Sequence, residues 1–230
     1  MDTAVHYNRD FIQIRACDNG GDTRLPTLGK RCGPVVVDMS MTVHIRRIAP
    51  DDGARLRGVR LAALRDAPES FWQTVAAESA RPPEDWTARA LRNSAGDAHA
   101  TFLLETGGDP IGMVEVHQPS LAPEFRELAG MWVGPAVRGT GAADALLDTA
   151  VNWARTAGAI GIRLWVIPTN TAAVRLYTRH GFELVGDLQR DTDDPAGKVY
   201  MPMLLTLDKE AAASPTFTTR ARAPWTDESG

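Results

Sequence analysis

The sequence contains little cysteine. Cys17 and Cys32 are the only two among 230 residues, and neither belongs to a C-x-x-C pair with a second pair of ligands. A structural zinc site needs such paired spacing, so we expect no metal site. One disulfide between the two cysteines is geometrically possible. We interpret them instead as two free thiols in a poorly structured segment.

Long apolar runs are also missing. No stretch approaches the ~20 apolar residues that a helix needs to span a bilayer. The N-terminal residues Met1 to Asp10 lack the basic segment followed by an apolar one that marks a signal peptide. These absences lead us to expect a cytoplasmic protein with no membrane partner.

The chain has no large excess of charge of either sign. Lys and Arg total 25 against 29 Asp and Glu, which gives a net charge of −4. This balance offers no argument for nucleic acid as a partner, and it is mildly compatible with a cationic amine substrate. The apolar fraction of 43% and the charged fraction of 23% are those of an ordinary globular protein, and the length suffices for one well-buried α/β domain.

Three regions of the chain differ in composition. Residues 1–40 are interrupted by Gly, Pro, Asn and Asp, which favour turns, so we expect a flexible N-terminal extension. Met39 and Met41 precede the first convincing strand, which also allows translation to start there. Residues 211–230 are rich in Ala, Thr, Pro and charge without periodicity, which predicts a disordered tail. The folded domain is therefore expected at residues 41–210.

Hydrophobic periodicity predicts alternating strands and helices inside this domain. We expect strands at 42–48, 101–105, 111–117, 127–133, 162–167, 182–185 and 199–205, and helices at 54–65, around 86–91, at 141–158 and at 171–179. The strands 101–105 and 111–117 should form a hairpin with a four-residue turn at 107–110. The order of elements predicts a three-layer α/β domain with a mixed sheet and one βαβ crossover.

The clearest chemical signal lies where the strand 127–133 turns into the longest helix. The turn contains Arg138, Gly139, Thr140 and Gly141. Glycines allow the backbone to approach a bulky anion closely. The first amides of a helix have no internal acceptor, and the helix N-terminus carries partial positive charge. This segment therefore suits a pyrophosphate, although its spacing fits neither the Rossmann fingerprint nor the P-loop.

Two motifs together resemble the GNAT superfamily of N-acetyltransferases. Arg138, Gly141 and Ala143 match R/Q-x-x-G-x-G/A, the coenzyme A loop of that family. The segment from Asn170 to Phe182 resembles N-x-x-A-x-x-L-Y-x-x-x-G-F and follows a strand, as the family pattern requires. The resemblance covers roughly residues 43–206. It implies a GNAT-like three-layer α/β/α domain whose central sheet is mixed but mostly antiparallel.

The resemblance also implies a cofactor and the residues that bind it. Acetyl-CoA would be the co-substrate, without a metal ion, and the chain would transfer acetyl to a primary amine of a small molecule or protein by direct attack. Backbone groups would hold the cofactor, and Asn170 and Tyr177 would contribute from the second motif. The implied backbone contacts are Met131, Trp132, Val133, Arg138, Gly139, Thr140, Gly141, Ala142 and Ala143.

Acid and base roles are implied for two side chains. Tyr177 would act as the general acid for the departing thiolate, since a phenol has a pKa near ~10, somewhat above that of a thiol. Glu127 is the candidate base, because it stands near the place where the histone-acetylating branch carries its catalytic glutamate. Glu115 and His117 are rivals, and many family members deprotonate through a chain of waters.

The acceptor remains open at this stage. Phe71 and Trp72 could line an acceptor cleft or pin their loop down, and the acidic residues 191–194 could attract a polyamine or a basic peptide. An alternative function is a non-catalytic acyl-CoA-binding sensor or scaffold with the same fold. A longer acyl chain and a homodimer are further possibilities. No nucleic acid partner is expected.

Overall fold

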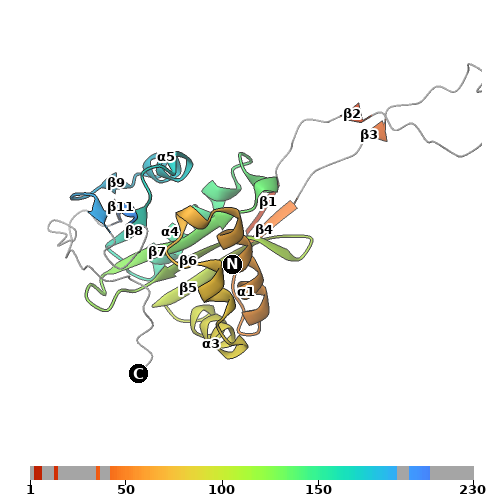
Figure 1. The fold of residues 1–230 in the computed structure, drawn as a ribbon, viewed down its shortest axis with the longest axis horizontal. Coiled ribbons are helices and arrows are strands. Elements are labelled where there is room, and N and C mark those ends of the chain that lie inside the picture. The colour runs from red at the N-terminus through yellow and green to blue at the C-terminus, as the bar shows by residue number, and fades with distance from the viewer. Residues whose placement is uncertain (1–2, 7–12, 15–34, 37–41, 191–196, 208–230) are drawn as a thin grey trace, which may run out of the picture.

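The computed structural model describes residues 3–6, 13–14, 35–36, 42–190 and 197–207 (Figure 1). Both cysteines, the acidic run 191–194 and the C-terminal segment 211–230 lie outside these residues, as does most of the segment 1–40. The predictions made for those segments therefore stay predictions.

The helices fall close to their expected positions. The α-helices are α1 (Gly53–Asp66), α2 (Val75–Ser79), α3 (Pro83–Ser94), α4 (Ala142–Thr156) and α5 (Thr171–Arg179), and two 3-10 turns are η1 (Pro68–Ser70) and η2 (Pro135–Val137). The short helix α2 and the turn η1 were not predicted as separate elements. Thr74 begins α2 by accepting a hydrogen bond from the Ala77 amide at 3.1 Å.

The strands of the domain also match the pattern of the sequence. They are β1 (Thr3–His6), β2 (Gln13–Ile14), β3 (Val35–Val36), β4 (Thr42–Arg47), β5 (His99–Thr106), β6 (Asp109–His117), β7 (Phe125–Val133), β8 (Gly161–Val166), β9 (Glu183–Leu184), β10 (Gln189–Arg190) and β11 (Val199–Thr206). The strands β10, inside the loop expected at 187–197, and β1 to β3, inside the expected extension, were not predicted.

Within the described residues the main sheet has the order β1-β4-β5-β6-β7-β8-β11-β10, and β9 pairs with β11. Neighbouring strands are antiparallel except β7 and β8, which are parallel and connected through α4. The predicted mixed, mostly antiparallel sheet with one βαβ crossover is therefore confirmed.

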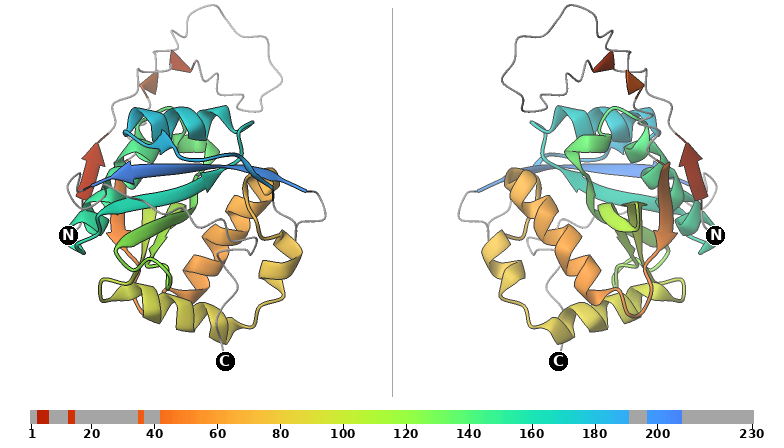
Figure 2. Two further views of the ribbon diagram at one scale, coloured as in Figure 1. Left: turned by 90° about the vertical axis from the view of Figure 1, so that its left-hand side faces the viewer. Right: turned by 90° about the vertical axis from the view of Figure 1, so that its right-hand side faces the viewer.

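Helices cover both faces of this sheet (Figure 2). Side chains alternate between the faces along a strand. Leu103 of β5 and Met113 of β6 pack with Trp86 of α3 and residues of α1. Their strand neighbours Phe102 and Val114 pack in the larger core, which includes α4 and α5. The three-layer α/β/α architecture is confirmed.

The predicted four-residue hairpin turn at 107–110 is wrong. Thr106 pairs with Asp109, which leaves only Gly107 and Gly108 in the turn, with φ of 56° and 90°. A two-residue hairpin turn of this kind needs positive φ at both positions, which glycine supplies without strain. Pro110 then belongs to β6, beside a shift in the β5–β6 register, where the missing amide N–H is tolerated.

Candidate active site

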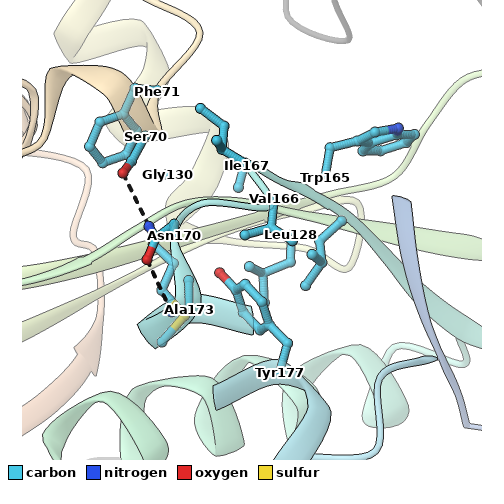
Figure 3. A pocket seen from close by; sticks show the side chains of 13 residues that line it. Ser70, Phe71, Leu128, Gly130, Trp165, Val166, Ile167, Asn170, Ala173 and Tyr177 are labelled. Carbon is cyan, nitrogen blue, oxygen red and sulfur yellow. Dashed lines mark hydrogen bonds between the residues drawn. The ribbon is translucent and has the colours of Figure 1, made fainter. Parts of the chain in front are cut away.

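The site lies where β7 and β8 stop pairing. Their parallel ladder runs from Phe125↔Gly161 to Glu127↔Arg163 and ends there. Beyond it, the next residues of each strand form opposite walls of a pocket (Figure 3), namely Leu128, Ala129, Gly130 and Met131 on β7 and Leu164, Trp165, Val166 and Ile167 at β8. Within the described residues, β7 and β8 therefore have no further ladder partners beyond Glu127 and Arg163.

A β-bulge shapes the β7 wall of the pocket. Met113 pairs with Trp132 and Glu115 with Ala129, so β7 carries one more residue than β6 over this stretch. The bulge contains Gly130, whose φ of 58° lies in the left-handed region that glycine adopts readily. A bulge bends its strand locally and redirects neighbouring groups.

Helix α5 supplies the opposite part of the pocket. Asn170 caps α5 by accepting a hydrogen bond from the Ala173 amide at 3.1 Å. Tyr177 lies two turns further along, lines the pocket and points its hydroxyl toward it (Figure 3). The side chain is buried, and burial raises the pKa of the Tyr177 hydroxyl above its ordinary value. The phenol therefore keeps its proton at neutral pH, as a proton donor must.

The segment after α1 closes the other end of the pocket. Ser70 and Phe71 line it. Asn170 Nδ2 donates to Ser70 Oγ at 3.1 Å (Figure 3). Lys198 Nζ donates to the Phe71 carbonyl at 2.9 Å. Trp72 packs against the Tyr200 ring instead, with 5.4 Å between the centroids. Of the two aromatic residues proposed for the acceptor cleft, Phe71 therefore lines the pocket and Trp72 pins the loop.

The glycine-rich loop lies between β7 and α4. Gly139 and Gly141 adopt φ of 73° and 91°. Gly141 is the N-cap of α4 and has no side chain to cap it. A Cβ at residue 139 would meet no atom within 4 Å, so the space beside the loop is open. Amides without a side-chain cap at the positive end of a helix suit a pyrophosphate.

Asp66, the last residue of α1, ties this loop to the rest of the domain. Trp132 Nε1 donates to Asp66 Oδ2 at 2.8 Å, and Arg138 Nη2 contacts the same oxygen. Arg138 Nε also donates to the Val133 carbonyl at 3.2 Å. Hydrogen bonds from Trp132 and Arg138 hold the pKa of Asp66 below its usual range.

The sequence prediction missed Asp66. The available signal was an acidic side chain in the last turn of a helix, where the helix dipole disfavours negative charge and a tertiary partner is expected. The contacts of Asp66 show that the Arg138 guanidinium and the Trp132 indole are bound to the protein itself. Among Met131, Trp132 and Val133, only Met131 lines the pocket of the described residues.

Glu127 does not line the pocket. Its carboxylate is buried and bonded to two neighbouring strands, with 3.1 Å between Oε2 and His117 Nε2 and 3.3 Å between Oε1 and Arg163 Nη2. The rival Glu115 is buried too, and Arg89 holds it through two contacts. Burial alone would raise the pKa of Glu115, but Arg89 and Arg60 outweigh it and lower that pKa. The structure thus brings Asn170, Tyr177 and Met131 together at the pocket. Glu127 lies outside it, at the last paired position of β7 and β8.

Fold and site together define an α/β protein whose central strands diverge around a pocket, with a glycine-rich loop before the crossover helix. The chain belongs to the acetyltransferase (GNAT) family, whose model matches residues 61–182. The match includes the glycine-rich loop, the divergent strands and the segment from Asn170 to Phe182. Within the described residues, no helix is long and apolar enough to cross a membrane.

Curated relatives share part of the chain. A mycothiol acetyltransferase of Sanguibacter keddieii is 30% identical over 145 residues, which are 61% of this chain and 43% of that protein. A mycothiol acetyltransferase of Rhodococcus erythropolis is 26% identical over 191 residues, or 80% of this chain and 60% of that protein. The chain thus spans about half the length of these curated relatives.

Solved structures share the fold. An acetyltransferase of the GNAT family from Streptococcus pneumoniae superposes with a TM-score of 0.62 at 22% identity, covering 71% of this chain and 98% of that one. A putative acetyltransferase from Salmonella typhimurium, solved with its cofactor acetyl-CoA, gives a TM-score of 0.61 at 20% identity over 78% and 99% of the two chains.

Proposed function

We propose that this protein transfers acetyl from acetyl-CoA to the primary amine of a small molecule or protein, by direct attack of the amine. The observation that carries this proposal is the position of Tyr177. Its buried hydroxyl faces the pocket between β7 and β8, on the same side of the sheet as α4 and its glycine-rich loop.

The residues present fit the cofactor. Acetyl-CoA supplies an acetyl group activated as a thioester. The amides from Gly139 to Ala143 would bind its pyrophosphate at the uncapped start of α4. The backbone of β7 around Met131, beyond its ladder with β8, would bind its pantetheine arm, as an added strand edge does. Asn170 would support the site indirectly, because it caps α5 and so fixes the helix that carries Tyr177.

Tyr177 is proposed as the general acid. A thiolate leaves more readily when a positioned hydroxyl donates a hydrogen bond or a proton to it. Burial raises the pKa of Tyr177, so its proton is present over the whole neutral range. Backbone amides at the bulge of β7 would stabilise the negative charge that develops on the acetyl carbonyl oxygen.

The amine must lose a proton before or during its attack, because an alkylammonium has no free electron pair. We propose Glu127 as the final proton acceptor through intervening water, since Leu128, the next residue, lines the pocket.

Glu127→Gln should lower the rate most at low pH, where little free amine exists, and less as pH rises. The pH–rate profile of the variant tests this, with the unfolding midpoint as the control for its lost contact with Arg163. An unchanged profile would mean that the proton leaves elsewhere.

A non-catalytic acyl-CoA sensor is the competing function, and the experiment that separates the two is coenzyme A release over a panel of amines and peptides. We expect thiol release with at least one amine. Tight acetyl-CoA binding without release on any amine would overturn the enzyme proposal. Propionyl-CoA and longer thioesters in the same assay test the preference for acetyl.

Support for acetyl transfer also comes from names printed for similar proteins. Several of the curated relatives are named mycothiol acetyltransferases, and one from Methanocaldococcus jannaschii is named an uncharacterized N-acetyltransferase. Because the chain spans only about half of those relatives, their acceptor enters here as one member of the panel to be tested.

A further inference from the structure

Arg60 is a buried arginine of α1 that the mechanism above does not use. The residue is only 6% exposed. Its Nε and Nη1 atoms are buried and have no hydrogen-bond partner among the residues that the structure describes. An arginine remains charged at neutral pH even where burial, as here, lowers its pKa. Burying charged N–H groups without hydrogen bonds is costly, so Nε and Nη1 call for an acceptor.

The guanidinium of Arg60 lies behind two residues that line the pocket. Its central carbon is 4.8 Å from the centre of the Phe71 ring. Its Nη1 atom is 3.5 Å from the position that a Cβ would take at Gly130. Phe71 and Gly130 both line the pocket, Phe71 in the segment after α1 and Gly130 on the β7 bulge. Because residue 130 has no side chain, no Cβ separates its backbone from Arg60 Nη1, and Glu115 Oε2 lies 3.6 Å from the same position.

The two buried carboxylates in this region are bound by other arginines. Glu115 on β6 receives Arg89 Nε at 3.0 Å and the Thr101 hydroxyl at 3.2 Å. Glu78 on α2 lies 3.7 Å from both Arg81 and Arg89. Asp85 on α3 is exposed and lies 3.8 Å from Arg81. Glu115 and Glu78 attract Arg60 electrostatically, but within the described residues neither accepts a hydrogen bond from its Nε or Nη1.

We propose that Arg60 binds a carboxylate of the acceptor, so that the acceptor is an amine carrying a carboxylate, such as a free amino acid. This inference rests on the proposed acetyl transfer and names the substrate class of the same pocket. A guanidinium binds carboxylates strongly through charge-assisted hydrogen bonds. Phe71 would cover one face of the guanidinium and separate this contact from water. Arg60 then determines specificity and takes no part in proton transfer.

Matched pairs of amines test the proposal by turnover. The full chain is assayed by coenzyme A release with the amino acids L-methionine, β-alanine and 4-aminobutyrate, and with the carboxamide of each, all compared at the same concentration of free amine. We expect at least one acid to exceed its amide in kcat/KM by roughly 10- to 100-fold, the effect of a hydrogen bond to a charged group. Arg60→Met should remove that advantage by raising KM for the acid, and leave the amide within about threefold; Arg60→Lys should retain part of it. Equal loss for acid and amide would indicate a structural role and overturn the proposal.

A second measurement keeps this inference distinct from the proposed reaction. Binding of the twenty N-acetylated amino acids and of their amides, with coenzyme A present, is measured by calorimetry for wild type and Arg60→Met. We expect an acid to bind at least 10-fold more tightly than its amide in wild type alone. If the protein acetylates amines but shows no preference for the acids over their amides, the role of Arg60 is overturned and the proposed acetyl transfer is supported. Absence of all turnover overturns acetyl transfer, and the binding arm still decides Arg60. Should Arg60→Met fail to fold, the acid–amide comparison in wild type decides it.

Discussion

Tyr177 illustrates how burial at one residue sets its chemistry. The sequence alone allowed a core aromatic residue or a proton donor at this position. In the structure the ring packs 5.6 Å from Phe182, between centroids, while the hydroxyl faces the pocket. One residue thus fills both roles, because the apolar body is buried and the polar end reaches the site.

Tyr177→Phe should lower turnover by roughly 100-fold and leave the Kd for coenzyme A nearly unchanged, as expected for loss of a general acid. Steady-state kinetics and calorimetry measure the two quantities. Wild-type turnover should not decline through ionisation of Tyr177 below about pH 10, since burial raises that pKa above the free value of ~10. Weakened cofactor binding with unchanged turnover would contradict the role.

Gly141 offers a second test at the residue scale. Its φ of 91° makes any side chain strained, so charge has to be separated from conformation. Asn tolerates the left-handed region better than most residues, and it has the shape of Asp without its charge. Gly141→Asp should abolish coenzyme A binding, and Gly141→Asn should weaken it much less, because only Asp opposes the pyrophosphate electrostatically. Titration calorimetry measures both; equal affinities would mean that the loop does not bind phosphate.

At the scale of elements, the pocket depends on a contact between segments 100 residues apart. Asn170 begins α5 and also bonds Ser70 beyond α1. Helix α5 is short, with nine residues, so its first turn needs the cap. The same amide side chain therefore supports the helix that carries Tyr177 and fixes the segment that carries Phe71.

Asn170→Ala should reduce the free energy of unfolding by about 1–2 kcal/mol, through loss of an N-cap. Ser70→Ala is the matched control, since it removes the bond to Ser70 and keeps the cap. Its cost should stay near about 0.5–1 kcal/mol, the typical net value of one hydrogen bond. Urea denaturation measures both variants, and a Ser70→Ala cost equal to that of Asn170→Ala would show that the cap contributes little.

At the scale of the whole molecule, an ion-pair network joins the first helix to the sheet. Asp52, before α1, binds Arg46 of β4 at 2.5 Å and Arg55 of α1 at 3.1 Å. Glu105 of β5 binds the same two arginines, each at 2.7 Å. Burial by itself would raise the pKa of Asp52, but the hydrogen bonds from Arg46 and from the Ala49 amide outweigh it and lower that pKa.

This network predicts how stability depends on pH. The folded pKa of Asp52 lies below the unfolded value of ~3.9, so its contribution is fully present above about pH 4 and is lost as pH falls through the folded pKa. Asp52→Asn should cost about 1.5–3 kcal/mol at pH 7, the value of a hydrogen bond to a charged group in a partly buried pair, and progressively less below pH 4. Urea denaturation from pH 7 to pH 2.5 measures the difference, and a constant difference across that range would contradict the assignment. Asp51→Asn, one residue earlier at an exposed position, is the control and should change little.

The sequence by itself determined the order of the principal helices and strands between residues 42 and 206, the crossover at α4, the glycine-rich loop and the cap at Asn170. These features depend on local physics: periodicity, turn chemistry and helix ends are encoded within a few neighbouring residues. It also indicated Tyr177, because a motif of fixed spacing places that residue on one face of a short helix. The boundaries of the domain at 41 and 210 remain predictions.

Only the tertiary structure decided which side chains meet. Asp66 approaches Arg138, Ser70 approaches Asn170, and Arg60 lies against Gly130, across long separations in the chain. The tertiary structure also shows that Glu127 does not line the pocket. The β7–β8 ladder ends at that residue, and its carboxylate binds side chains of neighbouring strands. Local sequence pattern cannot specify such contacts, since they depend on how strands pair, where a ladder ends and which helix packs on which face.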